Sequence, residues 1–375
     1  SFLVLTLLSN LTFAQETSAR KTHNVVETLP EVVITATRVE EALKDITQGV
    51  TVITKSDIEK KGVEFITDIL RSQTDLGIVQ NGGVGKNATL FLRGGSPNQT
   101  VFMIDGVKVK SPATGSLDIS GIIVDDIERI EIIKGPQSTL YGSDAMAGVI
   151  NIITKRGSGK PKLNISAEGG SFSTFKTDFS ISGSKDISAG SILDYRFTAT
   201  YFDTDGISAA KSGTENDGYT NKSFSSKIGL TPSERSRIEF NMRYYEDFSR
   251  LDGFQFGVGL VDDLNFFQRG KHFLISTKGI FFLLDIYEQT LTSSNISDNL
   301  TLEDPDTTSN NATIDTMMQT IDWQHNLYLN GITLTAGAEY RREGAEDKGN
   351  LNKNINNKGL YLNGKVKLFH DSLIF

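Results

Sequence analysis

Strict alternation of apolar and polar residues runs through the chain after residue 160. The run FKTDFSIS at 175–182 places its apolar residues on one strand face and its charged and hydroxyl residues on the other. The same pattern recurs around residues 193–201, 238–244, 332–340 and 360–368. Successive side chains of a strand point to opposite faces, so we predict ten or eleven strands after residue 160.

Two architectures share this alternation. A membrane barrel has lipid outside and a polar lumen inside, whereas an antiparallel sandwich has one face in water. The predicted connections 182–191 and 232–236 are short, and 203–221, 246–268 and 293–316 are long. Long loops on one rim and tight turns on the other are typical of outer-membrane barrels, which favours the barrel. No polar turn divides residues 271–292, so the strands there stay undefined.

Residues 31–157 have a different pattern, in which short β-branched runs alternate with turns marked by Gly and Asp. Ser56 or Asp57 can cap a helix that runs to Lys61 and ends at Gly62, and Asp105-Gly106 is a turn signal. Strands are predicted at 32–34, 50–53, 88–93, 100–104, 127–134 and 149–154, and a second helix at 66–72. The segment is therefore predicted to be an α+β domain.

The N-terminal residues 1–14 are almost wholly apolar and are followed directly by polar residues. Thr12 and Ala14 occupy the small-residue positions of a secretory cleavage site, and the stretch is shorter than the roughly 20 residues of a spanning helix. We interpret it as part of a signal peptide, with a buried helix as the alternative, and residues 15–30 as a flexible segment. The last five residues look like the start of another strand, so the sequence is interpreted as a fragment.

Composition excludes several classes of function. Lys plus Arg number 38 against 46 Asp plus Glu, a net charge of −8 that argues against a nucleic-acid partner. The chain has no cysteine, which removes disulfides and thiolate nucleophiles. Its four histidines are scattered singly, so neither a histidine-rich metal site nor a Ser-His-Asp triad is indicated, and we predict that the protein is not an enzyme.

A long motif carries a family resemblance. Residues 127–154, IERIEIIKGPQSTLYGSDAMAGVINIIT, closely resemble the plug-domain signature of TonB-dependent outer-membrane receptors, and LRG at 92–94 and MIDGV at 103–107 match further plug motifs. The resemblance covers residue 28 to the end and is strongest to about 157. It implies an α+β plug domain, residues 31–157, inside a transmembrane antiparallel β-barrel, of which residues 158–375 supply the N-terminal part, about half of the strands.

The resemblance also implies energy coupling. The segment 28–38, TLPEVVITATR, resembles the TonB box, which binds a TonB-type periplasm-spanning protein. Strand addition to a partner sheet gives main-chain hydrogen bonds that can bear a pull, although the segment is alternatively the first strand of the plug. The residues assigned to this contact are Glu31, Val32, Val33, Ile34, Thr35 and Ala36. Such a receptor is expected in the outer membrane of a Gram-negative bacterium, in contact with its lipid and as a monomer.

Ligand contacts are expected from the apical loops of the plug and the long loops of the barrel. Phe254 and Phe256 could cover an apolar ligand surface, or they belong to the aromatic girdle at the membrane interface. The plug candidates are Asn81, Gly82, Gly83, Lys86, Ser96, Asn98 and Gln99.

Acidic residues gather in two of the long loops. Calcium takes six to eight oxygen ligands, commonly carboxylates from flexible loops. The family resemblance implies that calcium orders the corresponding loops in one receptor type of the family, and Glu215, Asp217, Asp252 and Asp262 are the matching positions. The alternative is a solvated acidic loop with an Asn216-Asp217-Gly218 turn.

Within the family the chain is most similar to cobalamin receptors, through QNGG at 80–83 and YGSDA at 141–145. The predicted function is energy-coupled import of a scarce large nutrient, first of all cobalamin or another corrinoid. A ferric siderophore or other metal chelate is the alternative ligand, and a β-rich binding module without transport is the alternative class. No cofactor is required apart from calcium, if the acidic loops bind it.

Overall fold

The computed structural model describes residues 33–34, 38–39, 41–43, 46–188, 190–211, 213–255, 257–347, 351–368 and 373–374. The predicted signal peptide, the segment 15–30 and Phe256 lie outside these residues, as do Glu31, Val32, Thr35 and Ala36 of the predicted TonB box. None of the helices in the described part of the chain has the length and apolarity needed to span a bilayer.

The described residues up to 157, here called the plug, are built around a five-stranded sheet with the strand order β3-β8-β9-β6-β7. The pairing of β6 with β9 is parallel and the other pairings in this sheet are antiparallel. Two short pairs, β1-β2 and β4-β5, lie outside it. The elements are β1 (Val33–Ile34), β2 (Glu41–Ala42), β3 (Gly49–Thr54), α1 (Lys55–Lys61), α2 (Ile66–Arg71), β4 (Leu76–Gln80), β5 (Ala88–Leu92), η2 (Pro97–Gln99), β6 (Thr100–Ile104), β7 (Val107–Val109), β8 (Ile127–Lys134), α3 (Ser138–Tyr141), η3 (Ser143–Ala145) and β9 (Gly148–Thr154).

Helix α1 shows how local sequence sets the ends of an element. It begins after Thr54, whose hydroxyl accepts a hydrogen bond from the Asp57 backbone N–H, while the Asp57 carboxylate accepts one from the Thr54 N–H at 2.9 Å. This capping box satisfies two otherwise unpaired N–H groups. The predicted caps, Ser56 and Asp57, were therefore placed two or three residues late, whereas the predicted end at Gly62 is confirmed by its left-handed backbone, φ 57°.

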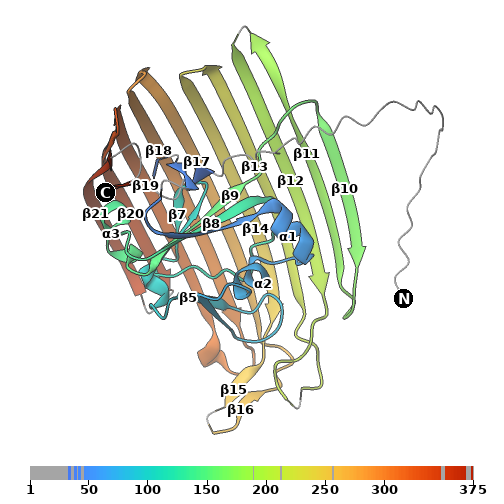
Figure 1. Ribbon diagram of the computed structural model, residues 1–375. Coiled ribbons are helices and arrows are strands. Elements are labelled where there is room, and N and C mark those ends of the chain that lie inside the picture. Colours follow the sequence, from blue (N-terminus) through green and yellow to red (C-terminus); the bar gives the residue numbers. More distant parts are fainter. Residues whose placement is uncertain are drawn as a thin grey trace, which may run out of the picture. The chain divides into compact units, whose positions relative to one another are not determined.

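The large sheet, here called the wall, contains eleven strands among the described residues, each antiparallel to its neighbours. Figure 1 shows these strands side by side in chain order, with α1, α2 and β5 of the plug in front of them. The elements are β10 (Lys162–Gly169), β11 (Phe175–Ser188), β12 (Ser191–Thr204), β13 (Tyr219–Ser233), β14 (Ser236–Arg250), β17 (Phe267–Leu284), β18 (Tyr287–Glu303), η4 (Thr308–Asn310), β19 (Ala312–Leu329), β20 (Ile332–Asp347), β21 (Leu351–Leu368) and β22 (Leu373–Ile374).

Connections of the wall alternate in length, as predicted. The turns at 234–235, 285–286 and 330–331 are tight, whereas 205–218, 251–266 and 304–311 are longer. The longest contains a separate hairpin, β15 (Gly253–Gln255) and β16 (Gly259–Val261), which extends beyond the lower edge of the wall in Figure 1. The stretch 271–292, which the sequence left undivided, turns at Asp285 and Ile286.

Burial of the two faces of the wall is the reverse of that in a soluble sheet, because the polar face is buried and the apolar face is exposed. Polar side chains such as Lys176, Thr198 and Asn241 are buried, and apolar ones such as Phe179 and Leu291 are exposed. The buried face is the one that contacts the plug, as the pairs of Lys176 with Glu64 and Asp125 show. An apolar outer face and a polar inner face match the barrel pattern.

Candidate functional site

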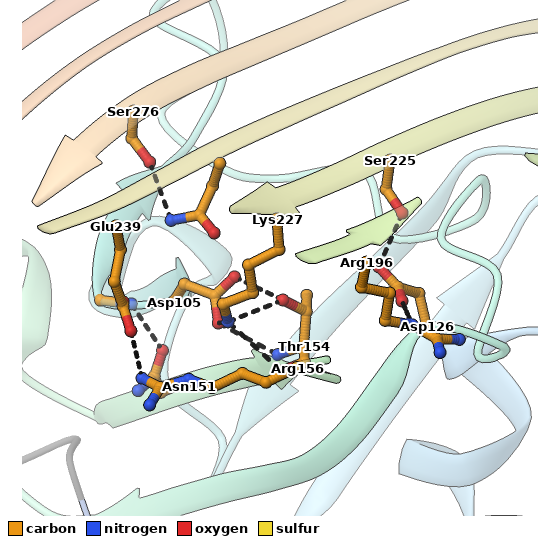
Figure 2. Close-up of polar contacts among 12 residues, drawn as sticks. Asp105, Asp126, Asn151, Thr154, Arg156, Arg196, Ser225, Lys227, Glu239 and Ser276 are labelled. Carbon is orange, nitrogen blue, oxygen red and sulfur yellow. Dashed lines mark hydrogen bonds and ion pairs between the residues drawn. The ribbon is translucent and has the colours of Figure 1, made fainter. Parts of the chain in front are cut away.

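The turn between β6 and β7 carries the most buried charged contact between plug and wall. Asp105 accepts hydrogen bonds from the Thr154 N–H at 3.0 Å and hydroxyl at 2.7 Å, and Lys227 of β13 lies 2.7 Å from the same carboxylate. Burial by itself raises the pKa of Asp105, but Lys227 and the Thr154 bonds outweigh it and lower that pKa below its ordinary value. Figure 2 shows Lys227 reaching down from the wall to Asp105 and Thr154.

A second charged contact centres on Asp126, just before β8. Its carboxylate accepts from Arg196 of β12 at 2.7 Å and from Ser225 of β13 at 2.7 Å. Figure 2 shows both side chains converging on Asp126 from the wall. Three consecutive wall strands therefore hold this edge of the plug, because Arg243 of β14 also lies 3.8 Å from the Asp126 carboxylate.

The third contact involves Arg38, the last residue of the predicted TonB-box region 28–38. Its guanidinium lies 2.9 Å from Asp322 of β19 and donates to the Tyr361 hydroxyl of β21 at 2.9 Å. The guanidinium also lies over the rings of Tyr141 and Tyr361, at 4.7 and 4.2 Å from their centroids, within cation–π range. Gln324 donates to the Arg38 carbonyl at 2.8 Å.

Among the cavities between plug and wall, two lie toward opposite ends of the wall strands. The inner cavity, about 1060 Å³, adjoins the tight-turn end of the wall and is lined by residues such as Arg38, Lys108, Lys278 and Thr292. The outer cavity, about 270 Å³, adjoins the long-loop end and is lined by residues such as Lys110, Tyr245, His272 and Asp298.

Three of the four predicted calcium residues come together, and Asp217 is not among them. Carboxylate oxygens of Glu215, Asp252 and Asp262 lie within 4.8 Å of one another, although they come from two different long loops. For Asp217, Asp252 and Asp262, one oxygen accepts bonds from loop N–H groups, namely those of Ala209, Ala210 and Thr214. The second oxygen of each, and Oε1 of Glu215, is buried without a hydrogen-bond partner. Unpaired buried carboxylate oxygens that converge are the donor set of a hard cation.

Crowding of these acids also affects their ionisation. Burial raises the pKa of Glu215, and the nearby charge of Asp217 raises it further. A divalent cation bound among these carboxylates would offset the repulsion between them and would be bound by their unpaired oxygens. The residues present therefore fit calcium.

Among the predicted ligand residues, the plug loop 81–86 packs against the first of these acidic loops. Lys86 is only 2% exposed, and its ammonium donates to Ser249 at 2.7 Å and to the carbonyls of Asp217 and Arg250. Burial lowers the pKa of Lys86 to about 8, although the carboxylates of Asp217 and Asp252 oppose the shift. A methyl group added to Gly82 would meet Ala209 at 3.3 Å. The structure thus gives Lys86 an anchoring contact, and its predicted role toward a ligand stays a prediction.

The other predicted positions are spread over three further places. Ser96, Asn98 and Gln99 belong to or flank the short helix η2, where Ser96 and Gln99 form a capping box. Phe254 lies in the β15–β16 hairpin and is largely exposed. Val33 and Ile34 form β1, which pairs with β2.

Sequence reasoning missed the residues that join plug and wall. Lys227, Arg196 and Asp322 stand at inward strand positions, where the alternation had shown only a polar face. The sequence did contain a signal for these contacts: a charged residue at the centre of a predicted membrane strand indicates a partner of opposite charge nearby.

A small α+β domain joined by buried charges to the polar face of an antiparallel sheet, whose other face is apolar, is the arrangement of a plugged membrane barrel. Comparison with known proteins agrees. Residues 42–149 match the family model of the TonB-dependent receptor plug domain. The chain is 29% identical over 325 residues to the vitamin B12 transporter BtuB of Vibrio vulnificus, covering 86% of this chain and 51% of that protein.

Two further relatives extend the comparison. The BtuB of Vibrio cholerae serotype O1 is 40% identical over 140 residues, 37% of this chain and 23% of that protein. The ferric-catecholate import receptor Fiu of E. coli has a similar fold, with a TM-score of 0.69 at 15% identity, covering 91% of this chain and 61% of that one. The chain spans about half the length of the first two curated relatives.

These matches place a TonB-dependent receptor plug domain at residues 42–149 and show that the rest of the chain resembles outer-membrane receptors of this class from Gram-negative bacteria. They confirm the predicted resemblance to the cobalamin-receptor type and the predicted plug followed by an antiparallel barrel.

Proposed function

We propose that the full-length protein imports a corrinoid, with cobalamin as the first candidate, across the outer membrane. The observation that supports this most is the similarity to vitamin B12 transporters over 84–86% of the chain. Solved siderophore receptors share the fold at 13–19% identity, which is too low to bear on the ligand. No enzymatic activity is part of the proposal, and the protein is proposed to act as a monomer in contact with membrane lipid.

We further propose that a TonB-type protein supplies the energy by pulling on residues 31–36. Arg38 follows this segment closely and is held by Asp322 and Tyr361, so a pull on the segment acts on this contact first. Because the outer membrane holds no ATP, mechanical work from the periplasm is the available source. A strand-like segment suits such a pull, because it can pair with the edge of a sheet in the partner through a series of main-chain hydrogen bonds.

The ligand is tested with the full-length protein in outer membranes of cells that lack their own corrinoid receptor. We expect saturable binding of radiolabelled cyanocobalamin and growth at limiting cyanocobalamin. Deletion of residues 28–37 should leave binding intact and abolish uptake. Binding of a ferric siderophore instead would assign the alternative ligand, and binding without uptake by the unaltered protein would favour a non-transporting module.

Calcium binding is proposed at Glu215, Asp217, Asp252 and Asp262. The ion would cross-link the loops 205–218 and 251–266 and hold them over the lumen. The unpaired oxygens of these four residues support the proposal, because a bound cation would give them a partner.

Loop digestion by trypsin provides the test, since Lys211 and Arg250 adjoin the cluster. Millimolar calcium should slow cleavage of both loops several-fold in the full-length protein, and Asp252→Asn should remove the protection. Asp205→Asn is the matched control, because Asp205 is exposed on the other of the two loops, 205–218, and lies outside the cluster. Equal cleavage with and without calcium would rule the site out.

A further inference from the structure

Polar contacts of the plug are unevenly distributed over the wall. Within the described ranges, plug side chains make ion pairs or hydrogen bonds with β11 to β14 on one side, through Lys176, Arg196, Lys227 and Arg243. On the other side they make them with β19 to β21, through residues such as Asp322 and Glu339. The described residues of β17 and β18, which lie between these groups, make neither kind of contact with the plug.

The contact with β17 and β18 is apolar instead. Leu274 of β17, Ile296 of β18 and Met318 of β19 are 7%, 6% and 1% exposed, and they belong to the same buried cluster as Ile104 and Val109 of the plug. Leu274 pairs directly with Ile296, and Ile296 with Met318. The three side chains therefore form one row across three strands, here called the apolar row.

This row interrupts a polar face. On its long-loop side, the adjacent row consists of His272, Asp298 and Thr316. On its tight-turn side, the adjacent row consists of Ser276, Ser294 and Thr320. Side chains on the inward face of a barrel do not contact lipid. Contact with lipid therefore does not explain why these three residues, opposite the plug, are apolar.

The two cavities supply that reason. The outer cavity is lined by Ile296 and by the polar row beyond it, and the inner cavity is lined by Ser294 and Thr320. On the plug, Ile104 and Val109 line the outer cavity, while Asp105 and Lys108 line the inner one. The apolar row and the β6–β7 hairpin together therefore separate the two cavities.

The hairpin is also suited to move. β7 is an edge strand of the plug sheet and pairs with β6 alone, through three residues. Its position is fixed by charged contacts at its two sides, Asp105 with Lys227 and Lys108 with Glu339 at 2.7 Å each. Displacing the hairpin separates β6 from β9, which pair through five residues, and leaves the pairing of β8 with β9 intact.

We propose that the ligand passes between the plug and strands β17–β18, and that the apolar row closed against the β6–β7 hairpin is the seal of this passage. The inference rests on the proposed import function. An apolar constriction excludes water and ions while closed, and it opens without breaking hydrogen bonds to β17 or β18. The contacts of Asp125 with Lys176 and of Asp126 with Arg196 keep the remainder of the plug joined to the wall.

The seal is tested by ion conductance of the full-length protein in planar bilayers, which needs no ligand. The double variant Leu274→Ala, Ile296→Ala should conduct several-fold more than the parent. Phe202→Ala is the matched control: Phe202 packs against Phe65 of the plug in a separate apolar cluster on β12 and lines neither cavity. Equal conductance of the control and the double variant would overturn the proposal, as would a folded double variant that conducts no more than the parent.

A milder variant covers the case in which the double variant does not fold. Because these 375 residues contain no cysteine, Ser276→Cys, next to the apolar row, adds a thiol whose maleimide labelling is compared with that of the parent protein. Its labelling should increase several-fold in energised cells given cyanocobalamin. Ser223→Cys, on the plug-facing side of β13, should not change.

The two cysteine variants also separate the inference from the proposed function. An increase at Ser223→Cys with none at Ser276→Cys would overturn the passage along β17–β18. Absence of cyanocobalamin uptake by the parent would instead contradict the import function, and the conductance measurement would still decide whether the apolar row is a seal.

Discussion

Lys227 is one of 38 basic residues, and its buried ion pair with Asp105 joins the plug to the wall. Its ammonium is buried against Asp105 and Thr154. Replacing it with methionine leaves the Asp105 carboxylate buried without its cation, and breaking a buried pair in this way costs about 3–5 kcal/mol.

The variant Lys227→Met should therefore lower the urea concentration at which trypsin first cleaves the plug of the folded receptor. Lys222→Met is the control on the same strand, because Lys222 is exposed and lies 3.8 Å from Glu246, a surface pair worth about 0–1 kcal/mol. An equal effect of the two substitutions would contradict the role assigned to Lys227.

These residue-level contacts were only partly predictable. Arg38 and Asp322 are 284 positions apart in the chain, so no local pattern joins them. The acidic cluster was predictable because its residues concentrate in two loops that a barrel places on the same rim. Lys86 was assigned to a ligand by its place in a glycine-rich loop, whereas its burial against the loop 205–218 depends on tertiary packing that the sequence does not show.

At the scale of elements, the longer plug strands were predicted to within a residue, whereas the alternating runs of the wall marked only parts of longer strands such as β11 and β21. β6 and β8 have the predicted bounds, and β9 begins one residue earlier, at Gly148. β4 and β7 were missed. β7 has only three residues after the Asp105-Gly106 turn, too few for an alternation to be recognised, and its existence depends on pairing with β6.

Gly148 begins β9 because the backbone there is tightly packed. A methyl group at this position would lie 2.2 Å from the Ile133 carbonyl oxygen and 2.5 Å from Leu92. We expect Gly148→Ala to lower the free energy of unfolding of the plug by about 1–3 kcal/mol, the usual cost of overpacking, in urea titrations of the full-length protein.

The matched control is Gly49→Ala in β3. Its added methyl group would lie 3.8 Å from the Lys134 Cβ, an ordinary contact. If both substitutions destabilised the plug equally, the close approach of β8 and β9 at Gly148 would not be the cause.

At the scale of the whole molecule, period-two alternation predicted the strands of the wall but not which face is covered. That choice depends on the surroundings, since a sandwich buries its apolar face and a barrel exposes it to lipid. The buried face carries Lys176 and Lys227, and the exposed face carries Phe179 and Ile321. The alternating loop lengths were the feature of the sequence that indicated the correct choice.

The outward apolar face gives the last prediction. Ile321 lies near the middle of β19, between β18 and β20, and is 52% exposed. If this face contacts the hydrocarbon core, Ile321→Arg places a charge in lipid at a cost of about 2–4 kcal/mol. A smaller amount of folded full-length protein should then reach the outer membrane, measured by heat-modifiable migration on gels.

Ile207→Arg is the control, because Ile207 is equally exposed, 54%, but lies in a long loop outside the strands. A protein whose wall faces water would tolerate both substitutions alike, and that result would contradict the membrane assignment.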